Sequence, residues 1–368
     1  MKFSISRESL LAPLQQVVSV IERKQTMPIL SNVLIRFEDG NLFLTGSDLE
    51  VQLVAQTNID SDDVGKVTLP ARKVLDICRL LPDKSVLKFN FRDEKAELSA
   101  ASSRFNLSTL PAENYPVFDA GSVEIGFQVA APLLKKALDK TMFAMAAQDY
   151  RYYLNGVLLE LDGIHLTTVA SDGHRLCFFQ DKLETATEME YRQIIVPRKG
   201  IAELYRLLGD NTETLSLNLS SNTLLADLGS FSFSSKLIEG RYADYKKVLP
   251  KALAHEIRVD RSTLKSALNR VSILSGEKQR SVTLEISQSS SLIIRSQNPE
   301  HEDAEETLSV ESTGGDITVG FNAAYLLDAV NNIDSDDVKL SLPAGCGSCV
   351  IEDTRDNRFL FIVMPMRL

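Results

Sequence analysis

The hydrophobic positions of the chain follow one spacing that occurs three times along its length. Each copy begins with two apolar residues that alternate with polar ones, as in a half-buried strand, and continues with two that lie four apart, as on one helix face. The copies are Phe3, Ile5, Leu10 and Leu14, then Phe127, Val129, Leu134 and Leu138, then Ile257, Val259, Leu264 and Leu268. Each copy therefore predicts a strand, a turn and a helix.

The same order of elements is expected twice within each copy. The first helix is predicted from Glu8 to Ile21 and is followed by three alternating segments that are typical of strands. After Pro70 a second helix is expected, which stops at Pro82 and again precedes three strands. A further helix is predicted from Pro132 through Met142. The pattern indicates two βαβββ halves in each repeat.

The repeats lie 124 and then 130 residues apart in a chain of 368 residues, which indicates three domains. We expect their borders at 1–121, 122–250 and 251–368. Units of this length are too long for solenoid repeats and should be closed domains with their own sheets. The predicted fold class is α+β, with three tandem domains that carry helices on one side and sheets on the other.

Composition excludes several classes of protein. Hydrophobic residues make up 44% and charged residues 24%, without a long uncharged apolar run, which favours a soluble globular protein over a membrane or disordered one. The N-terminus does not resemble a signal peptide, so we expect a cytoplasmic protein with reduced thiols. Cys346 and Cys349 have the spacing of a zinc pair but lack two further ligands nearby, so neither a metal nor a cofactor is expected.

Charge is unevenly distributed between helices and the rest of the chain. The net charge of −10 argues against nucleic acid as a partner. However, the six predicted helices sum to +8, which leaves −18 for everything else. If the helices share one side of the domains, that side suits phosphates and carries no motif for reading bases. Solvated outer faces of amphipathic helices are the alternative explanation.

Two rival functions remain open at this point. Ser171, Asp172 and His174 lie within four residues and could suggest a hydrolase, but a catalytic triad needs groups that converge from separate elements. A turn or a binding pocket is therefore favoured there, no catalytic residue is assigned and no enzyme is expected. The other rival is a protein-binding scaffold that never contacts nucleic acid, against which the positive helices argue.

Several motifs together resemble the bacterial DNA polymerase III beta subunit family, the sliding clamps of the replisome. The resemblance covers the whole chain and rests on residues 151–156, 171–176, 196–200 and 364–368. It implies a processivity factor whose head-to-tail homodimer closes into a ring, with helices around duplex DNA. Such a ring slides without sequence specificity. It tethers the replicative polymerase catalytic subunit, the clamp loader and other DNA-handling proteins through short linear peptides, and involves no membrane.

The resemblance also implies three groups of site residues. Lys24 and Gln148 would contact DNA by match to the family, whereas Arg72, Lys136 and Arg198 are proposed from charge alone. Across the dimer interface, Lys73, Phe105 and Leu107 of one subunit would face Ile273, Leu274, Glu300 and Asp303 of the other. The partner-peptide pocket would consist of Arg151, Tyr153, Leu154, Ser171, Gly173, His174, Arg175, Leu176, Lys247, Val248, Asn322, Tyr325, Ser348, Val363, Met364, Pro365 and Met366. The chain departs from the family at Ala243, often Pro, and at Cys346, often aliphatic.

Overall fold

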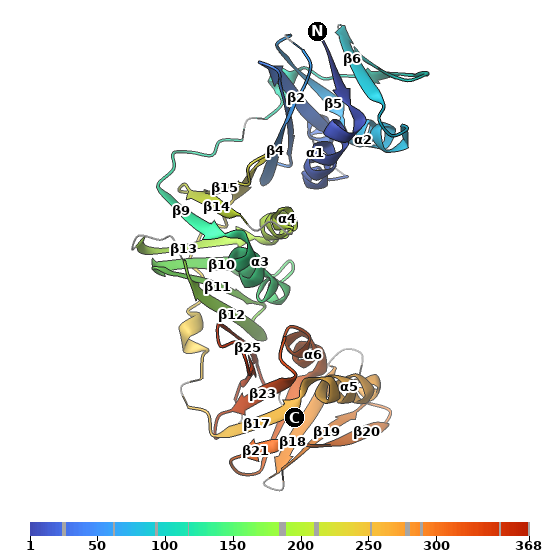
Figure 1. The fold of residues 1–368 in the computed structure, drawn as a ribbon. Coiled ribbons are helices and arrows are strands. Elements are labelled where there is room, and N and C mark those ends of the chain that lie inside the picture. The colour runs from blue at the N-terminus through green and yellow to red at the C-terminus, as the bar shows by residue number, and fades with distance from the viewer. Residues whose placement is uncertain are drawn as a thin grey trace. The chain divides into compact units, whose positions relative to one another are not determined.

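The computed structural model describes residues 1–23, 27–61, 63–92, 95–116, 118–183, 189–209, 213–250, 252–276, 280–287, 290–345 and 347–366. Within these ranges the order βαβββ occurs six times, with one additional short strand in the last third (Figure 1). Lys24, Cys346 and the last two residues of the 364–368 motif, all named above, lie outside the described residues.

The first third of the chain contains β1 (Lys2–Ser6), α1 (Arg7–Val20), β2 (Asn32–Glu38), β3 (Asn41–Ser47), β4 (Val51–Asn58), β5 (Gly65–Pro70), α2 (Ala71–Leu80), β6 (Val86–Arg92), β7 (Lys95–Ala100) and β8 (Ser103–Ser108). The second contains β9 (Ile125–Ala130), α3 (Ala131–Asp139), β10 (Gly156–Gly163), β11 (His165–Ser171), β12 (Arg175–Lys182), β13 (Met189–Pro197), α4 (Arg198–Leu208), β14 (Thr214–Leu219), β15 (Thr223–Asp227) and β16 (Phe231–Lys236). The last contains β17 (His255–Asp260), α5 (Arg261–Val271), β18 (Ser281–Ser287), β19 (Ser291–Gln297), β20 (Asp303–Ser309), β21 (Glu311–Thr313), β22 (Ile317–Asn322), α6 (Ala323–Asn331), β23 (Asp337–Leu342), β24 (Cys349–Asp353) and β25 (Phe359–Val363).

The helix predictions are confirmed in place, with one difference in extent. The first helix runs from Arg7 to Val20, one residue off the prediction at each end, and the Ser6 hydroxyl caps it by accepting the Ser9 amide. The prediction that the third helix reaches Met142 was wrong, because α3 ends at Asp139 and a separate 3₁₀ turn begins at Met142. The Thr141 hydroxyl donates to the Ala137 carbonyl at 2.7 Å, which occupies one of the carbonyl groups left free at the end of the helix.

The sheets link the two halves of each domain. The described strands form sheets in the orders β1-β6-β7-β8, β5-β2-β3-β4-β16-β15-β14-β9, β13-β10-β11-β12-β25-β24-β23-β17-β21 and β20-β19-β18-β22. Each strand that precedes a helix pairs with strands of the other half, as β1 does with β6. Because the halves exchange strands in this way, neither half has a complete sheet without the other.

The chain divides into two compact units. Unit 1 comprises residues 1–132 and 199–237, and unit 2 comprises residues 133–198 and 238–368. This division passes through the predicted second domain because β16 pairs with β4 in unit 1, whereas β12 pairs with β25 in unit 2. The borders expected at 121 and 250 remain predictions.

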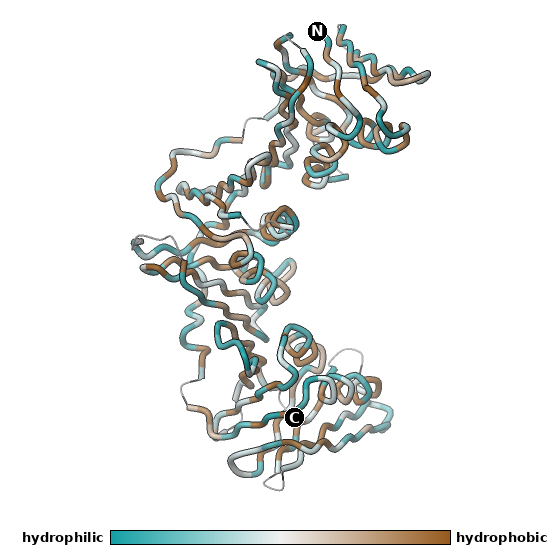
Figure 2. The backbone as a smooth tube through the Cα atoms, in the orientation of Figure 1, coloured by the Kyte–Doolittle hydropathy of each residue, from teal (hydrophilic) through white to brown (hydrophobic). Residues whose placement is uncertain are grey.

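The core of each unit lies between helices and sheets. Leu10, Leu14 and Val17 of α1 are buried, and α1 packs on β3 and β4. A Cβ atom at Gly46 of β3 would lie 2.7 Å from the Val17 carbonyl oxygen, so glycine permits this close approach. In Figure 1, α1 lies beside α2 in unit 1 and α5 beside α6 in unit 2. Figure 2 shows hydrophobic and hydrophilic residues interspersed along the helices and strands, as expected for elements that bury one face. No helix among the described residues is long and apolar enough to cross a membrane.

Candidate functional site

The candidate site in unit 2 is built around the tight turn between β11 and β12. The Ser171 hydroxyl donates to the Arg175 carbonyl at 2.6 Å and accepts the Gly173 amide at 3.1 Å. The Asp172 Oδ1 atom accepts the amides of His174 and Arg175 at 2.9 and 3.0 Å. Short polar side chains at its first two positions therefore hold the turn in one shape.

Arg151 packs against this turn at a position that only glycine leaves open. Its guanidinium donates to Asp149 at 3.0 and 2.9 Å and to the Asp172 carbonyl at 3.2 Å. Gly173 has a φ of +87°, and a Cβ atom there would lie 2.7 Å from the Arg151 guanidinium nitrogens. The hydrogen bond from Arg151 lowers the pKa of Asp149 to about 2. Arg151 is thereby held beside the turn with a defined orientation.

Arg175 links β12 to α6. Its guanidinium contacts the carboxylates of Asp172 and Asp328, donates to the Phe143 carbonyl at 3.0 Å and lies 4.7 Å from the centroid of the Tyr325 ring. Burial alone would lower the pKa of Arg175, but the two carboxylates outweigh it and the pKa is raised. This cation therefore fixes the position of α6 relative to the turn.

The geometry does not support a hydrolase at this turn. His174 stacks on Tyr325, with ring centroids 6.3 Å apart and planes at 19°. The Ser171 hydroxyl bonds to a backbone carbonyl, and Asp172 bonds to Arg175 and to backbone amides. These side chains therefore do not line up as a nucleophile, a base and an orienting acid.

The C-terminal segment completes the polar part of the site. In β25, Val363 pairs with Arg175 of β12 and with Cys349 of β24, and Ser348 directly precedes Cys349. Beyond β25 the Met364 amide donates to the His174 carbonyl at 2.9 Å, and the Met366 amide donates to the Gly320 carbonyl at 2.8 Å. Residues 364–366 are thus tied to the turn at one end and to β22 at the other.

An apolar cluster adjoins the turn. Leu154 and Leu176 are buried in it together with Tyr242, Tyr245 and Ile362. Tyr153 and Val248 are partly buried and pack at its edge, and the Tyr153 ring meets Tyr242 edge to face at 6.1 Å. The structure therefore brings four of the apolar candidates, Tyr153, Leu154, Leu176 and Val248, into one cluster.

A buried carboxylate anchors the segment that carries Lys247 and Val248. The Glu160 side chain is 2% exposed and accepts hydrogen bonds from Tyr245 at 2.9 Å, Gln193 at 2.6 Å and Tyr191 at 3.0 Å. The Lys246 ammonium lies 3.2 Å away. Burial alone would raise the pKa of Glu160, but these donors outweigh it, so its pKa lies below the ordinary value of 4.5.

Glu160→Gln should lower the unfolding free energy of unit 2 by roughly 1–3 kcal/mol at pH 7, because the donors lose a charged acceptor. Since the pKa of Glu160 is lower in the folded state, its stabilisation is fully present above pH 4.5 and is lost as the pH falls through the lowered pKa. Urea unfolding at pH 7 and pH 3.5 should therefore show the difference between wild type and variant shrinking in acid. Glu256→Gln, an exposed substitution in the same unit, is the control. A difference that stays constant with pH would refute this role.

The remaining pocket candidates are held less tightly. The side chain of Lys247 is 83% exposed and lies 3.1 Å from Asp244. Asn322 caps α6 by accepting the Ala324 amide at 2.9 Å.

The Cys349 thiol is buried, and burial raises its pKa to about 12. The described residues contain no group of three or more His, Cys, Asp or Glu side chains that could hold a metal ion.

The candidate DNA-contacting residues differ in how free their charges are. The Lys136 ammonium lies 2.6 Å from Asp356, and Arg198 donates to the Met145 and Ala146 carbonyls. Arg72 is exposed and donates to the Ile21 carbonyl at 2.9 Å. Gln148 is exposed, with a φ of +58°. Counting charges in the sequence therefore overstated the positive charge of the helices, because acidic groups nearby neutralise part of it.

The candidate interface residues lie at sheet edges, on exposed turns and, for Lys73, on helix α2. β8 and β20 are the last strands of their four-stranded sheets. β8 carries Phe105, which is partly buried, and Leu107, which is 8% exposed. Ile273 is 77% exposed and Leu274 is partly buried, on a 3₁₀ turn that follows α5. Lys73, Glu300 and Asp303 are exposed.

Sequence reasoning missed several residues of the unit 2 site. Asp328 pairs with Arg175, Asp149 pairs with Arg151, and Tyr242 lies in the apolar cluster. Asp328 is the single charged residue of α6, and this isolation was a signal that it pairs with a cation. No comparable signal marked Tyr242, because only the folded linker brings it to Leu176.

Family models match three successive parts of the chain. The N-terminal domain of the DNA polymerase III beta subunit matches residues 1–119, its central domain residues 128–244 and its C-terminal domain residues 246–367.

Similar proteins and structures cover the whole chain. The beta sliding clamps of Pseudomonas aeruginosa and Haemophilus influenzae are 42% and 43% identical, with 100% of each chain covered. The crystal structure of a sliding clamp from P. aeruginosa bound to griselimycin superposes with a TM-score of 0.96 at 42% identity, over 100% of both chains. A polymerase III beta structure from Caulobacter crescentus has a TM-score of 0.95 at 33% identity, again over 100% of both chains.

Proposed function

Because the chain belongs to the DNA polymerase III beta subunit family, the beta sliding clamps, we propose how its own residues close a ring, hold DNA and bind partners. The protein is a DNA sliding clamp and a processivity factor of the replicative polymerase. The observation that carries this function is the similarity of all three clamp domains along the full chain. A clamp tethers and does not catalyse, so the protein is proposed to be non-enzymatic. It is also proposed to act in the cytoplasm.

The proposed assembly is a head-to-tail homodimer. Lys73, Phe105 and Leu107 of one copy would contact Ile273, Leu274 and the acidic residues Glu300 and Asp303 of the other. Two equal contacts related by a two-fold axis close a ring. Support comes from the free edges of β8 and β20, which pairing across the interface would cover, and from the exposed Ile273 side chain. The domain borders at 121/122 and 250/251 are proposed from the spacing of the three repeats, alongside family models that match residues 1–119, 128–244 and 246–367.

DNA is proposed to be held by enclosure and touched only weakly. Nonspecific phosphate contacts give dissociation constants of about 10⁻⁴ to 10⁻⁶ M at physiological salt and allow sliding. Arg72, Gln148 and Arg198 are the candidate contacts, together with Lys24. Lys136 is the weakest candidate because Asp356 already neutralises its charge. Weak contacts suit a clamp, since tight ones would stop it moving.

Partners are proposed to bind through short peptides at the unit 2 site. Tyr153 and Val248, partly exposed at the edge of the cluster that buries Leu154 and Leu176, offer an apolar surface for the peptide's hydrophobic side chains. Arg151 and His174 lie at its polar side, where their positions are already fixed by Asp149 and Tyr325. Such pre-organisation reduces the entropy lost on binding. The polymerase catalytic subunit and the clamp loader would be among the proteins that compete for this surface.

Primer extension tests this function. A replicative polymerase and its clamp loader should make much longer products per binding event when this protein is added to primed circular DNA under single-turnover conditions. The gain should disappear when the loader or ATP is omitted. Products of unchanged length in the complete reaction would contradict the proposed function.

A further inference from the structure

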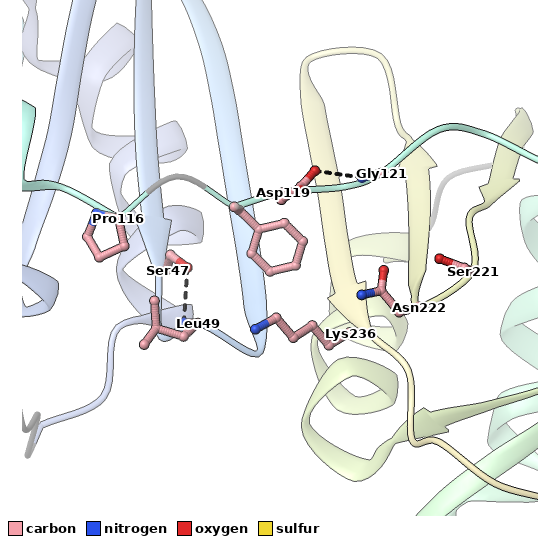
Figure 3. A pocket seen from close by; sticks show the side chains of 9 residues that line it. Ser47, Leu49, Pro116, Asp119, Gly121, Ser221, Asn222 and Lys236 are labelled. Atoms are coloured by element: carbon pink, nitrogen blue, oxygen red, sulfur yellow. Dashed lines mark hydrogen bonds between the residues drawn. The ribbon is translucent and has the colours of Figure 1, made fainter.

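Unit 1 contains a cavity of about 320 Å³ where β4 and β16 pair and the linker after β8 passes. Leu49, Pro116 and Phe118 supply apolar walls, and Asn222 and Lys236 supply polar ones. Figure 3 shows these elements meeting around the cavity, with the Lys236 side chain extending from the end of β16 toward Leu49. None of the roles assigned above uses this cavity.

The turn that borders the cavity is built like the turn of the unit 2 site. In Ser47–Val51, the Ser47 hydroxyl donates to the carbonyl four residues on at 3.2 Å and accepts the Leu49 amide at 3.2 Å. The Asp48 Oδ1 atom accepts the next two amides at 2.9 and 2.7 Å. The same four hydrogen bonds, position for position, hold residues 171–175.

The strand that closes each site also ends in the same way. The Lys236 amide donates to the Glu50 carbonyl at 2.8 Å, as the Met364 amide donates to the His174 carbonyl at 2.9 Å. Lys236 therefore occupies in unit 1 the position that Met364 occupies in unit 2.

The linker that follows β8 and the linker that follows β16 also match. Tyr115 and Tyr242 are each 5% exposed, and burial raises the pKa of both phenols. Phe118 follows Tyr115 at the distance at which Tyr245 follows Tyr242. The cavity is thus the internal repeat of the proposed peptide site, formed by the same elements of the repeated fold.

The side chains differ between the two sites in ways that change what can bind. Leu49 keeps the left-handed conformation, with a φ of +77°, at the position of Gly173, and such strain in a non-glycine residue concentrates at functional sites. The Lys236 ammonium has no ion-pair partner among the described residues. In Figure 3 the Asp119 carboxylate accepts the Gly121 amide and does not turn toward Lys236.

We propose that this cavity is a second peptide-docking site, which takes a short extended segment carrying a hydrophobic side chain next to a carboxylate. The hydrophobic side chain would pack on Phe118 and Leu49, and the carboxylate would pair with Lys236. The ligand class rests on the proposed function of the unit 2 site, whereas the cavity and its hydrogen bonds do not. Clamp partners could then be held at two points on one chain, which raises the effective concentration of each contact.

The test uses the full-length protein and a fluorescein-labelled hexapeptide, Gly-Ser-Leu-Asp-Phe-Gly, with versions in which Asn or Lys replaces Asp. Fluorescence anisotropy should show the Asp peptide binding best. Lys236→Glu should weaken its binding by about tenfold and improve binding of the Lys peptide, because the charge contact is reversed. Lys88→Glu, an equal charge change at an exposed position of β6, should have no effect.

Two outcomes would overturn the proposal. One is equal affinity of the Asp peptide for wild type and Lys236→Glu. The other is loss of binding when residues 364–368 are deleted, since this would place the peptide at the unit 2 site. Thermal unfolding of each variant controls for misfolding. Primer extension by wild type is independent of both results, so failure of this proposal is distinguishable from failure of the proposed function.

Discussion

Replacing Ile273 and Leu274 with aspartate should convert the proposed dimer into monomers. Ile273 is 77% exposed in the single chain, so its substitution should not disturb the core, and thermal unfolding of the double variant controls for Leu274, which is partly buried. In the ring the new carboxylates would replace apolar contacts with Phe105 and Leu107 of the other copy at each of two interfaces. Desolvating a charge in this way costs several kcal/mol. The dissociation constant of the dimer should rise by at least about 10³-fold, and retention on circular DNA should be lost with it.

Light scattering at a series of protein concentrations measures this change directly. Val64→Asp is a suitable control because Val64 is also a large exposed apolar residue, at 65%, and lies outside the proposed interface. That variant should remain a dimer. If the double variant kept the mass of a dimer, the assignment of Ile273 and Leu274 to the interface would be wrong.

Deleting residues 364–368 should reduce the affinity of the unit 2 site for a partner peptide by at least about a hundredfold, while the dimer stays intact. The deletion removes the Met364 and Met366 amides, which bond to the His174 and Gly320 carbonyls, together with two deformable apolar side chains. Truncation of a single hot-spot residue costs about 2 kcal/mol or more, and a hundredfold loss from removing both methionines corresponds to about 2.7 kcal/mol.

Isothermal titration with a peptide from a clamp-binding partner measures the loss. The volume-conserving variant Met364→Leu is the matched control and should lose less than about tenfold. In light scattering, the truncated protein should remain a dimer, as wild type does. Unchanged peptide affinity after the deletion would show that partners bind elsewhere.

The elements of the fold were predictable because periodicity reports which face of a helix or strand is buried. The stripe through Leu10, Leu14 and Val17 placed α1 within one residue at each end. The pairing of β1 with β6 in the other half of the domain was not predictable. Alternation shows which face of a strand is buried but does not show which strand lies beside it. The division into two compact units depends on such pairings and was missed for the same reason.

The candidate site was predictable in part. The residues around Ser171 could be recognised because short polar side chains at fixed spacing are typical of one turn. The contacts of Arg175 with Asp328 and Tyr325 join segments about 150 residues apart in the sequence, which no local pattern reveals. Similarly, Lys140 counted as a basic helix residue, but its ammonium is buried and lies 2.9 Å from Asp334.

The central claim is that the protein holds DNA by enclosing it, and retention on circular DNA tests this most directly. The protein is loaded onto a nicked circular plasmid with its clamp loader and washed in 1 M salt, roughly where phosphate contacts are screened. It should remain bound to the circle and should slide off once a restriction enzyme cuts the circle into a linear molecule. Equal loss from circular and linear DNA would contradict the account.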